Sequence, residues 1–250
     1  MRRIAFAVAA LLLAFAGFSG FVALGTWQVE RRAWKLDLIA RVDARVHAPA
    51  VAAPGPAQWP QLGAAADEYR HVRLAGTFLN ERETLVQAVT SLGSGFWVLA
   101  PLQAADGSVV LVNRGFVPPE ARDRAARKAS EPTGPVVVTG LLRLTEPGGG
   151  FLRRNDAAGD RWYSRDVQAI AAARGLDNVA PFFIDADAGP GMPGGAERTW
   201  PAGGLTVIAF HNNHLVYALT WYALALMVAG AAWRVLREKK RQDRQDAKPH

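Results

Sequence analysis

IAFAVAALLLAFAGFSGFVAL at residues 4–24 and LVYALTWYALALMVAGAAW at residues 215–233 are two charge-free apolar stretches near the ends of a chain of 250 residues. A helix needs about 20 apolar residues to cross the hydrocarbon core of a bilayer. Both stretches are close to that length. They therefore predict an integral membrane protein with one transmembrane helix at each end.

The N-terminal stretch has an alternative interpretation as a cleavable signal peptide, because Arg2 and Arg3 precede it. The stretch is longer than the apolar region of an ordinary signal peptide, and no clean small-x-small cleavage site comes before Gly25. These features favour an uncleaved membrane anchor.

Charged residues beside the two stretches predict how the chain is oriented. Short basic flanks remain in the cytoplasm, whereas long domains translocate largely regardless of charge. We therefore expect a multi-pass protein of the bacterial cell (inner) membrane, with both termini cytoplasmic. The expected division is a transmembrane helix at 1–24, a periplasmic domain at 25–210, a second transmembrane helix at 211–236 and a basic tail at 237–250. The basic residues after the second stretch are Arg234, Arg237, Lys239, Lys240, Arg241, Arg244 and Lys248.

Between the stretches, short runs of alternating or β-branched residues predict a strand-rich domain. Asp106-Gly107 is a good hairpin turn, residues 30–45 predict an amphipathic helix, and 166–174 predict a second helix. The expected fold class is an α+β membrane protein, in which a two-helix transmembrane hairpin carries an antiparallel β-rich extracytoplasmic domain. Strands are expected at 71–78, 84–88, 96–103, 109–113, 136–144, 181–185 and 205–210.

Composition narrows the possible functions. The net charge is +7, but the cations are dispersed rather than gathered in one basic patch, so nucleic-acid binding is not expected. There is no cysteine, which excludes disulfides, thiolate metal sites and covalent CxxC haem attachment. The sequence also lacks the Walker, HExxH and GxSxG motifs of common enzymes.

His211 and His214 stand at the expected outer end of the second transmembrane helix. Titratable side chains at membrane depth tend to be functional, and imidazole is a common ligand of metals and of haem iron. The alternative is that both histidines lie in the headgroup layer and hydrogen-bond to water. Position alone leaves both interpretations open.

Because both helices cross the same membrane, their outer ends should lie at the same level. This brings Trp27, Gln28, Arg31 and Lys35 to the height of His214. A haem in this place could have its iron on the imidazole and its propionates facing the cations, since Arg suits carboxylates well. The same cations could instead be ordinary interfacial anchors.

Five segments in order resemble the Surfeit-locus-one family of cytochrome c oxidase assembly factors. The likeness runs from about residue 25 to residue 221 and includes the opening Gly25-Thr26-Trp27-Gln28 with Arg31 and Lys35. The other segments are Tyr69-Arg70 with Val72, Gly76 and Phe78; Asn113-Arg114-Gly115-Phe116-Val117-Pro118; Asn155-Asp156 with Trp162, Tyr163 and Asp166; and Asn212-x-His214-Leu215-x-Tyr217-x-x-Thr220-Trp221.

The resemblance implies an assembly factor for haem-copper cytochrome c oxidase and not an enzyme. It implies transient binding of haem a, with His214 as the ligand of the haem iron, and delivery to the oxidase catalytic subunit. The expected partners are that subunit, the haem a synthesis enzymes and membrane lipid. A haem-free membrane scaffold that stabilises oxidase assembly intermediates is the alternative. The candidate cofactor-binding residues are His214, Trp27, Gln28, Arg31, Lys35, Tyr217 and Trp221.

Overall fold

The structure is a computed structural model that describes residues 2–150, 152–188, 199–206, 208, 210 and 212–246. It divides into two compact units, one formed by residues 1–41 with 209–250 and the other by residues 42–208. His211 and most of the Gly/Pro-rich loop at 188–204 lie outside the described residues.

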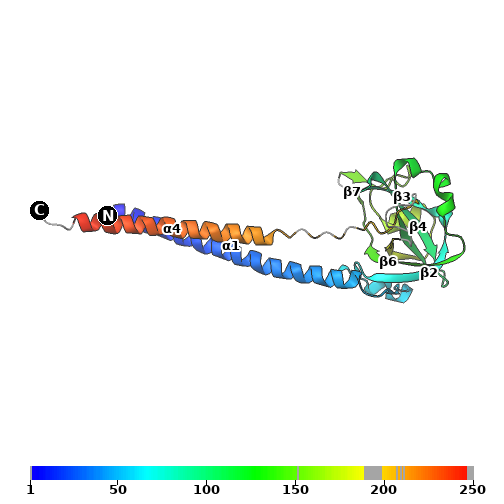
Figure 1. Ribbon diagram of the computed structural model, residues 1–250, viewed down its shortest axis with the longest axis horizontal. Helices are drawn as coiled ribbons and strands as arrows, with labels where there is room; N and C mark the ends of the chain where they lie inside the picture. Colours follow the sequence, from blue (N-terminus) through cyan, green and yellow to red (C-terminus); the bar gives the residue numbers. More distant parts are fainter. Residues whose placement is uncertain are drawn as a thin grey trace. The chain divides into compact units, whose positions relative to one another are not determined.

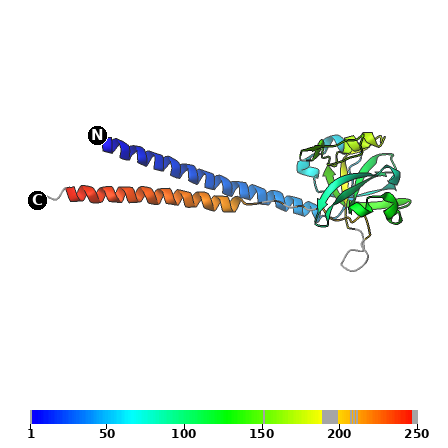
Figure 2. The ribbon, with the colours of Figure 1, turned by 90° about the horizontal axis from the view of Figure 1, so that it is seen from above.

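The first unit is a pair of long helices, α1 (Arg2–Val46), of which residues 42–46 belong to the second unit, and α4 (His214–Asp246). They run antiparallel, so that the start of α1 and the end of α4 lie at the same end of the pair (Figures 1 and 2). Both helices are long and apolar enough to cross a membrane, as the sequence predicts. Many of their large apolar side chains are largely exposed, among them Phe6, Leu12, Leu13, Phe15, Leu219, Leu226 and Met227.

Helix α1 does not end at residue 24, where the membrane-spanning segment was expected to end. It continues without a break to Val46 and so includes the amphipathic helix predicted at 30–45. Residue 24 therefore marks an expected level in the membrane rather than the end of a helix.

The second unit is built on a seven-stranded sheet with the order β1-β2-β6-β9-β5-β4-β3. Strand β4 also pairs with β2 through Thr77↔Gln103 and Phe78↔Leu102, so β2, β6, β9, β5 and β4 close into a barrel. The strands are β1 (Val51–Ala52), β2 (His71–Phe78), β3 (Thr84–Thr90), β4 (Gly93–Gln103), β5 (Val109–Val117), β6 (Pro135–Leu144) and β9 (Val179–Ala186).

Short helices and a small hairpin surround this barrel. Helix α3 is capped at its N-terminus by the Asp166 carboxylate and followed by Gly175 at φ +59°, the left-handed geometry common after helices. These elements are α2 (Ala64–Asp67), α3 (Val167–Ala173), β7 (Gly149–Gly150), β8 (Arg153–Arg154), and the 3₁₀ helices η1 (Pro56–Gln61), η2 (Asn80–Arg82), η3 (Pro119–Ala121) and η4 (Arg124–Ser130).

The sheet is mixed, which corrects the expectation of an antiparallel domain. Strand β9 lies between β6 and β5; it is antiparallel to β6 but parallel to β5, and β1 is parallel to β2. Local hairpin signals identify neighbours in sequence, such as the β4–β5 pair. They carry no information about a strand that returns after about sixty residues of intervening chain to fill a distant sheet edge.

The closing strand predicted at 205–210 is also wrong for the described part of that segment, since residues 205, 206, 208 and 210 have no strand assignment. The backbone pairing occurs earlier, where Ala202 and Phe116 exchange two hydrogen bonds of 2.9 Å. Strand β9 follows β5 only as far as Asn113. The backbone edge at Phe116 is therefore free to pair with Ala202, which precedes the segment 205–210 in the sequence.

The two larger of three buried apolar clusters in the described residues form most of the core. The strands that close the barrel contribute the first cluster, including Val72, Leu102, Val112, Leu142 and Ile184. The second packs α3 against the outside of the sheet and includes Leu111, Trp162, Ile170 and Phe183. Residues 109–113 of β5 are buried on both faces, which explains why this segment is nearly continuous in apolar residues rather than alternating.

A buried ion network centres on Asp185, whose residue is only 3% exposed. Its carboxylate accepts hydrogen bonds from Asn113 Nδ2 at 2.8 Å, Arg143 Nη1 at 3.0 Å and Arg165 Nη1 at 3.0 Å. Both arginines also pair with Glu146, and Arg143 pairs with Glu68. Every charge in the network therefore has an opposite partner, which is what burial of charge requires.

His71 joins two segments of the domain through both ring nitrogens. Nδ1 lies 2.9 Å from the Ala48 carbonyl oxygen and Nε2 lies 2.8 Å from Asp187 Oδ2. Burial lowers the pKa of His71, but the hydrogen bonds to Asp187 and Ala48 outweigh it and raise the pKa above its ordinary value. The protonated ring is thus the form that the fold favours.

This geometry predicts a pH-dependent stability. Because the pKa of His71 is higher in the folded state, its stabilising contribution is complete below the unfolded pKa of about 6.5. It is lost as the pH rises through the folded pKa. We expect the free energy of unfolding to fall as pH rises across this window in the wild type, and to change less in a His71→Gln variant. Urea titrations at several pH values give the free energy of unfolding of each protein. If it changed equally with pH in the wild type and in His71→Gln, the assignment would be contradicted.

Candidate functional site

Two residues of the helical pair, far apart in sequence, meet directly. His214, the first residue of α4, lies with Nδ1 2.7 Å from the Oε1 of Gln28 on α1. The amide oxygen is an acceptor, so Nδ1 carries the proton. In the neutral form of the ring, Nε2 is then the nitrogen whose lone pair can bind a metal, in the arrangement common for metal-bound histidines.

Two of the cations on α1 beyond Gln28 lie close to aromatic rings. Lys35 Nζ is 5.1 Å from the ring centre of Phe210, and the Arg31 guanidinium is 4.1 Å from the ring centre of Trp34. Within the described part of the chain, neither cation pairs with a carboxylate. Both are therefore available to an anionic ligand without first breaking an ion pair.

The other predicted site residues divide by helix face. Trp221 faces α1 and stacks on Phe21, with ring centres 5.7 Å apart and an angle of 22° between the planes. Trp27 and Tyr217 are instead 53% and 54% exposed. The structure thus joins Gln28 to His214 and Trp221 to Phe21, and leaves Trp27 and Tyr217 on outward faces of the pair.

One contact at this level was not predicted. Thr26 Oγ1 and Tyr222 Oη lie 3.1 Å apart, and Gly25 is buried against the ring of Tyr222. A Cβ on Gly25 would come within 2.7 Å of that ring. Glycine at this position lets the two helices approach closely beside the Gln28–His214 pair. Ala218, in the turn after His214, is another small buried residue, and it allows close approach from the side of α4.

A metal centre here would depend on a single imidazole. Among the residues that the structure describes, no cluster of three or more His, Asp or Glu could hold a metal ion. The arrangement of one imidazole with a free ring nitrogen, two unpaired cations and flanking aromatic residues fits haem, which needs one axial ligand, apolar surroundings and partners for its propionates.

The Asn113-to-Pro118 segment has a structural role instead. Asn113 is buried; it donates to Asp185 and accepts from Gly115 N–H at 3.1 Å. Gly115 has φ +129°, and a Cβ there would lie 2.2 Å from the Ala202 carbonyl oxygen. Phe116 is fully buried. This segment shapes the barrel and presents little surface for recognition.

The segment from Asn155 to Asp166 is structural for the same reason. The Asn155 side-chain oxygen accepts hydrogen bonds from the backbone of Tyr163 and Ser164, Trp162 is in the core, and Asp166 caps α3. By contrast, the first and last of the five segments named in the sequence analysis, which contain Gln28 and His214, leave side-chain groups available to a ligand.

Comparison with known proteins identifies the family of this chain. The model of the SURF1 family matches residues 15–226. Surfeit locus protein 1 of Mus musculus is 38% identical over 218 residues, covering 80% of this chain and 67% of the relative. The proteins of the same name from Homo sapiens and Xenopus tropicalis are 37% identical over 220 residues and 36% identical over 232 residues. These alignments cover 81% and 86% of this chain, and 69% and 70% of the relatives.

The family match covers most of the chain, including the two segments that meet at the helical pair, and these relatives also cover most of the chain. The chain therefore belongs to the SURF1 family, whose members are cytochrome c oxidase assembly factors and not enzymes.

Proposed function

We propose that this protein binds haem a transiently and assists its delivery to the catalytic subunit of a haem-copper cytochrome c oxidase. The observation that carries the proposal is the 2.7 Å contact between Gln28 and His214, because it holds one imidazole through Nδ1 and leaves Nε2 as the ring nitrogen that a metal could bind. Bound haem a would supply the iron and porphyrin that the oxidase requires. His214 would hold the iron through Nε2, and Lys35 and Arg31 would attract the propionates.

The weakness of such a site suits delivery. A single imidazole anchors the iron on one side only, so release requires one coordinate bond to break. His214 lies at the start of α4, where Leu215 and Val216 beside it are exposed. We infer a site that is open to exchange with a partner rather than one that retains its ligand permanently.

The proposed topology follows from the flanking charges. The described end of α4 carries Arg234, Arg237 and Lys239, which favour a cytoplasmic position. Residues 25–210 would then lie in the periplasm, and His214 would stand at the outer surface of a bacterial inner membrane. The haem a synthesis enzymes, which are the proposed donors, would share that membrane with the oxidase.

The proposed function can be tested with the full chain in detergent. We expect protein that is co-expressed with haem a synthesis enzymes to purify with a haem a absorption spectrum and a near-equimolar haem content. Protein made without those enzymes should lack that spectrum. If protein from both cultures is colourless while it still co-purifies with oxidase subunits, the alternative of a haem-free scaffold is correct.

Gln28 is proposed as a positioning residue that acts through His214. We expect Gln28→Leu to weaken haem a binding by about ten- to a hundredfold, the usual cost of losing the partner of a metal-bound histidine. Gln28→Glu keeps an acceptor oxygen and should bind more tightly than Gln28→Leu. Titration of the apoprotein with haem a, followed by absorbance, gives the dissociation constants. Identical values for the wild type and Gln28→Leu would contradict this role.

A further inference from the structure

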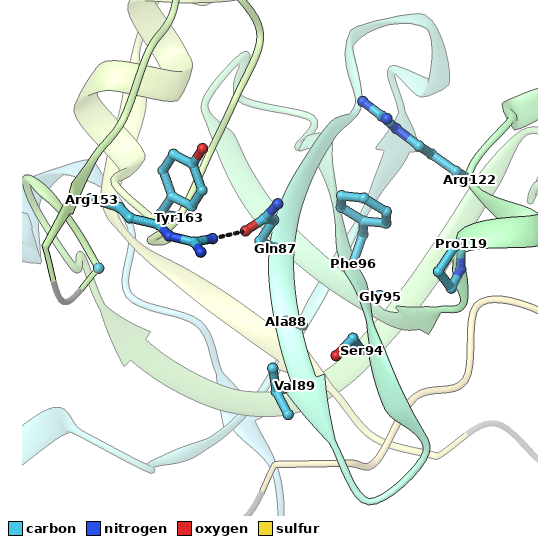
Figure 3. Close-up of a pocket in the computed structure, with 11 residues that line it drawn as sticks. Gln87, Ala88, Val89, Ser94, Gly95, Phe96, Pro119, Arg122, Arg153 and Tyr163 are labelled. Atoms are coloured by element: carbon cyan, nitrogen blue, oxygen red, sulfur yellow. Dashed lines mark hydrogen bonds between the residues drawn. The ribbon is translucent and has the colours of Figure 1, made fainter.

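A groove of about 670 Å³ crosses one face of the β3–β4 hairpin in the barrel domain. Figure 3 shows Arg153 and Tyr163 on one side of the hairpin, and Phe96, Pro119 and Arg122 on the other. Its floor is formed by residues of both strands, among them Ala88 and Gly95, which are paired across the hairpin. All the residues that line the groove belong to the unit formed by residues 42–208.

Each side of the groove carries an arginine held over an aromatic ring. The Arg122 guanidinium lies 5.0 Å from the ring centre of Phe96, and that of Arg153 lies 5.4 Å from the ring centre of Tyr163. Arg153 also donates to Gln87 Oε1 at 3.0 Å. Stacking of this kind fixes a guanidinium in place while its N–H groups stay available to a carboxylate.

These two arginines differ from many others in the domain. Arg70, Arg124, Arg127, Arg143, Arg161, Arg165 and Arg174 each form an ion pair with a carboxylate. Within the described residues, Arg122 and Arg153 have no such partner, and no Asp or Glu lines the groove. The groove therefore presents uncompensated positive charge, which complements an acidic ligand.

Strand β3 adds an exposed backbone edge beside the groove. Gln87 N–H points away from β4 and donates to the Trp162 carbonyl oxygen at 2.8 Å. In an antiparallel pair the direction alternates along the strand, so the N–H and C=O of Val89 point the same way. In the described part of the chain no backbone hydrogen bond outside the hairpin reaches Val89, whose side chain is 84% exposed.

We propose that this groove docks an extended, acidic segment of a partner protein. Its carboxylates would pair with Arg122 and Arg153, and its backbone would add to the β3 edge at Val89, which is a recurring mode of peptide recognition. An extended peptide suits a concave surface with aromatic sides, whereas a flat anionic membrane would not fill it. The identification of the partner as part of oxidase assembly rests on the proposed function, but the docking itself does not.

The test measures peptide binding to the full chain in detergent by fluorescence anisotropy. The probe is a short labelled peptide of alternating glutamate and valine, and the same peptide with lysine in place of glutamate is the comparison. We expect binding of the glutamate peptide alone, weakened by added salt. The Arg122→Gln/Arg153→Gln double variant should bind it about five- to tenfold more weakly, as expected for partly exposed ion pairs.

Two further variants sharpen the result. Arg73→Gln removes an exposed arginine from β2, away from the groove residues, and should bind the peptide like the wild type. Ser94→Glu places a negative charge in the groove while both arginines remain, and should weaken binding as the double variant does. The double variant, Arg73→Gln and Ser94→Glu should all keep the haem content of the wild type. Peptide binding and haem binding can therefore fail independently, which distinguishes this proposal from the haem proposal.

Several outcomes would overturn the proposal. These are equal binding of the glutamate and lysine peptides, equal loss in Arg73→Gln, or no loss in the double variant and in Ser94→Glu. A further outcome is that phosphatidylglycerol vesicles, but not the peptide, bind in a manner that depends on Arg122 and Arg153. That result would assign the groove to lipid headgroups instead.

Discussion

A His214→Ala variant is expected to lose nearly all bound haem a while the protein keeps its fold. The reason is that His214 would supply the iron ligand, and the helical pair offers the iron no other described histidine. His214 is half-buried, and its Nδ1 contact is with Gln28. Removing it leaves one amide without a partner at an accessible place, so the cost in stability should be small.

The measurement is the haem-to-protein ratio of purified His214→Ala, made under the conditions that load the wild type. His47→Ala is a matched control because His47 is an exposed histidine with a side chain 73% accessible. The control should retain its haem. Equal haem content in His214→Ala and wild type, at equal thermal stability, would refute the assignment of the ligand.

Asp185→Ala is expected to destabilise the barrel domain by about 3–5 kcal/mol, the range typical of removing one partner from a buried ion pair. The substitution removes the acceptor of Asn113 and one carboxylate partner each of Arg143 and Arg165. Glu68 and Glu146 can compensate the two arginines only in part, because Asp185 is the carboxylate that contacts both of them from within the core.

Chemical denaturation of the full chain measures this effect, followed by the fluorescence of the domain tryptophans. Asp177→Ala is the control, since Asp177 is exposed at the loop between α3 and β9. It should change the free energy of unfolding by less than about 0.5 kcal/mol. A loss of similar size in both variants would show that the network adds no stability of its own.

Much of the domain can be predicted from the sequence because its strands carry local signals. The predicted strand at 71–78 coincides with β2, and the helix predicted at 166–174 contains α3 together with its capping Asp166. What local pattern cannot give is which strands become neighbours. The placement of β9 beside β5, and the use of Ala202 in place of 205–210 at the Phe116 edge, depend on which edges remain free after other pairs form.

The candidate site was predictable in the same uneven way. Two antiparallel helices that cross the same membrane bring their corresponding ends together, and this brings Gln28 to the level of His214. Helical periodicity could also have shown that Trp27 lies about 100° from Gln28 and faces elsewhere. The packing of Gly25 on Tyr222 had no such signal, because it depends on the rotation of each helix about its own axis.

The ion network illustrates a different limit. Asp185 and Asp187 are two residues apart and resemble a carboxylate pair in sequence, yet the structure gives them separate roles. Asp185 is the centre of the buried network, whereas Asp187 contacts His71. Alternation alone would place residues two apart on the same face of a sheet, but β9 ends at Ala186, so Asp187 lies outside the strand and is not bound by that pattern. Their partners lie between 20 and 116 residues away in the sequence.

The most direct test of the haem site identifies the iron ligand itself. Pulsed electron paramagnetic resonance of the ferric haem a-loaded protein detects the magnetic coupling between the iron and a coordinated imidazole nitrogen. The proposal predicts a histidine nitrogen signal that disappears in His214→Ala and returns when free imidazole is added to that variant. A histidine signal that persists unchanged in His214→Ala would place the iron on another residue and contradict the proposal.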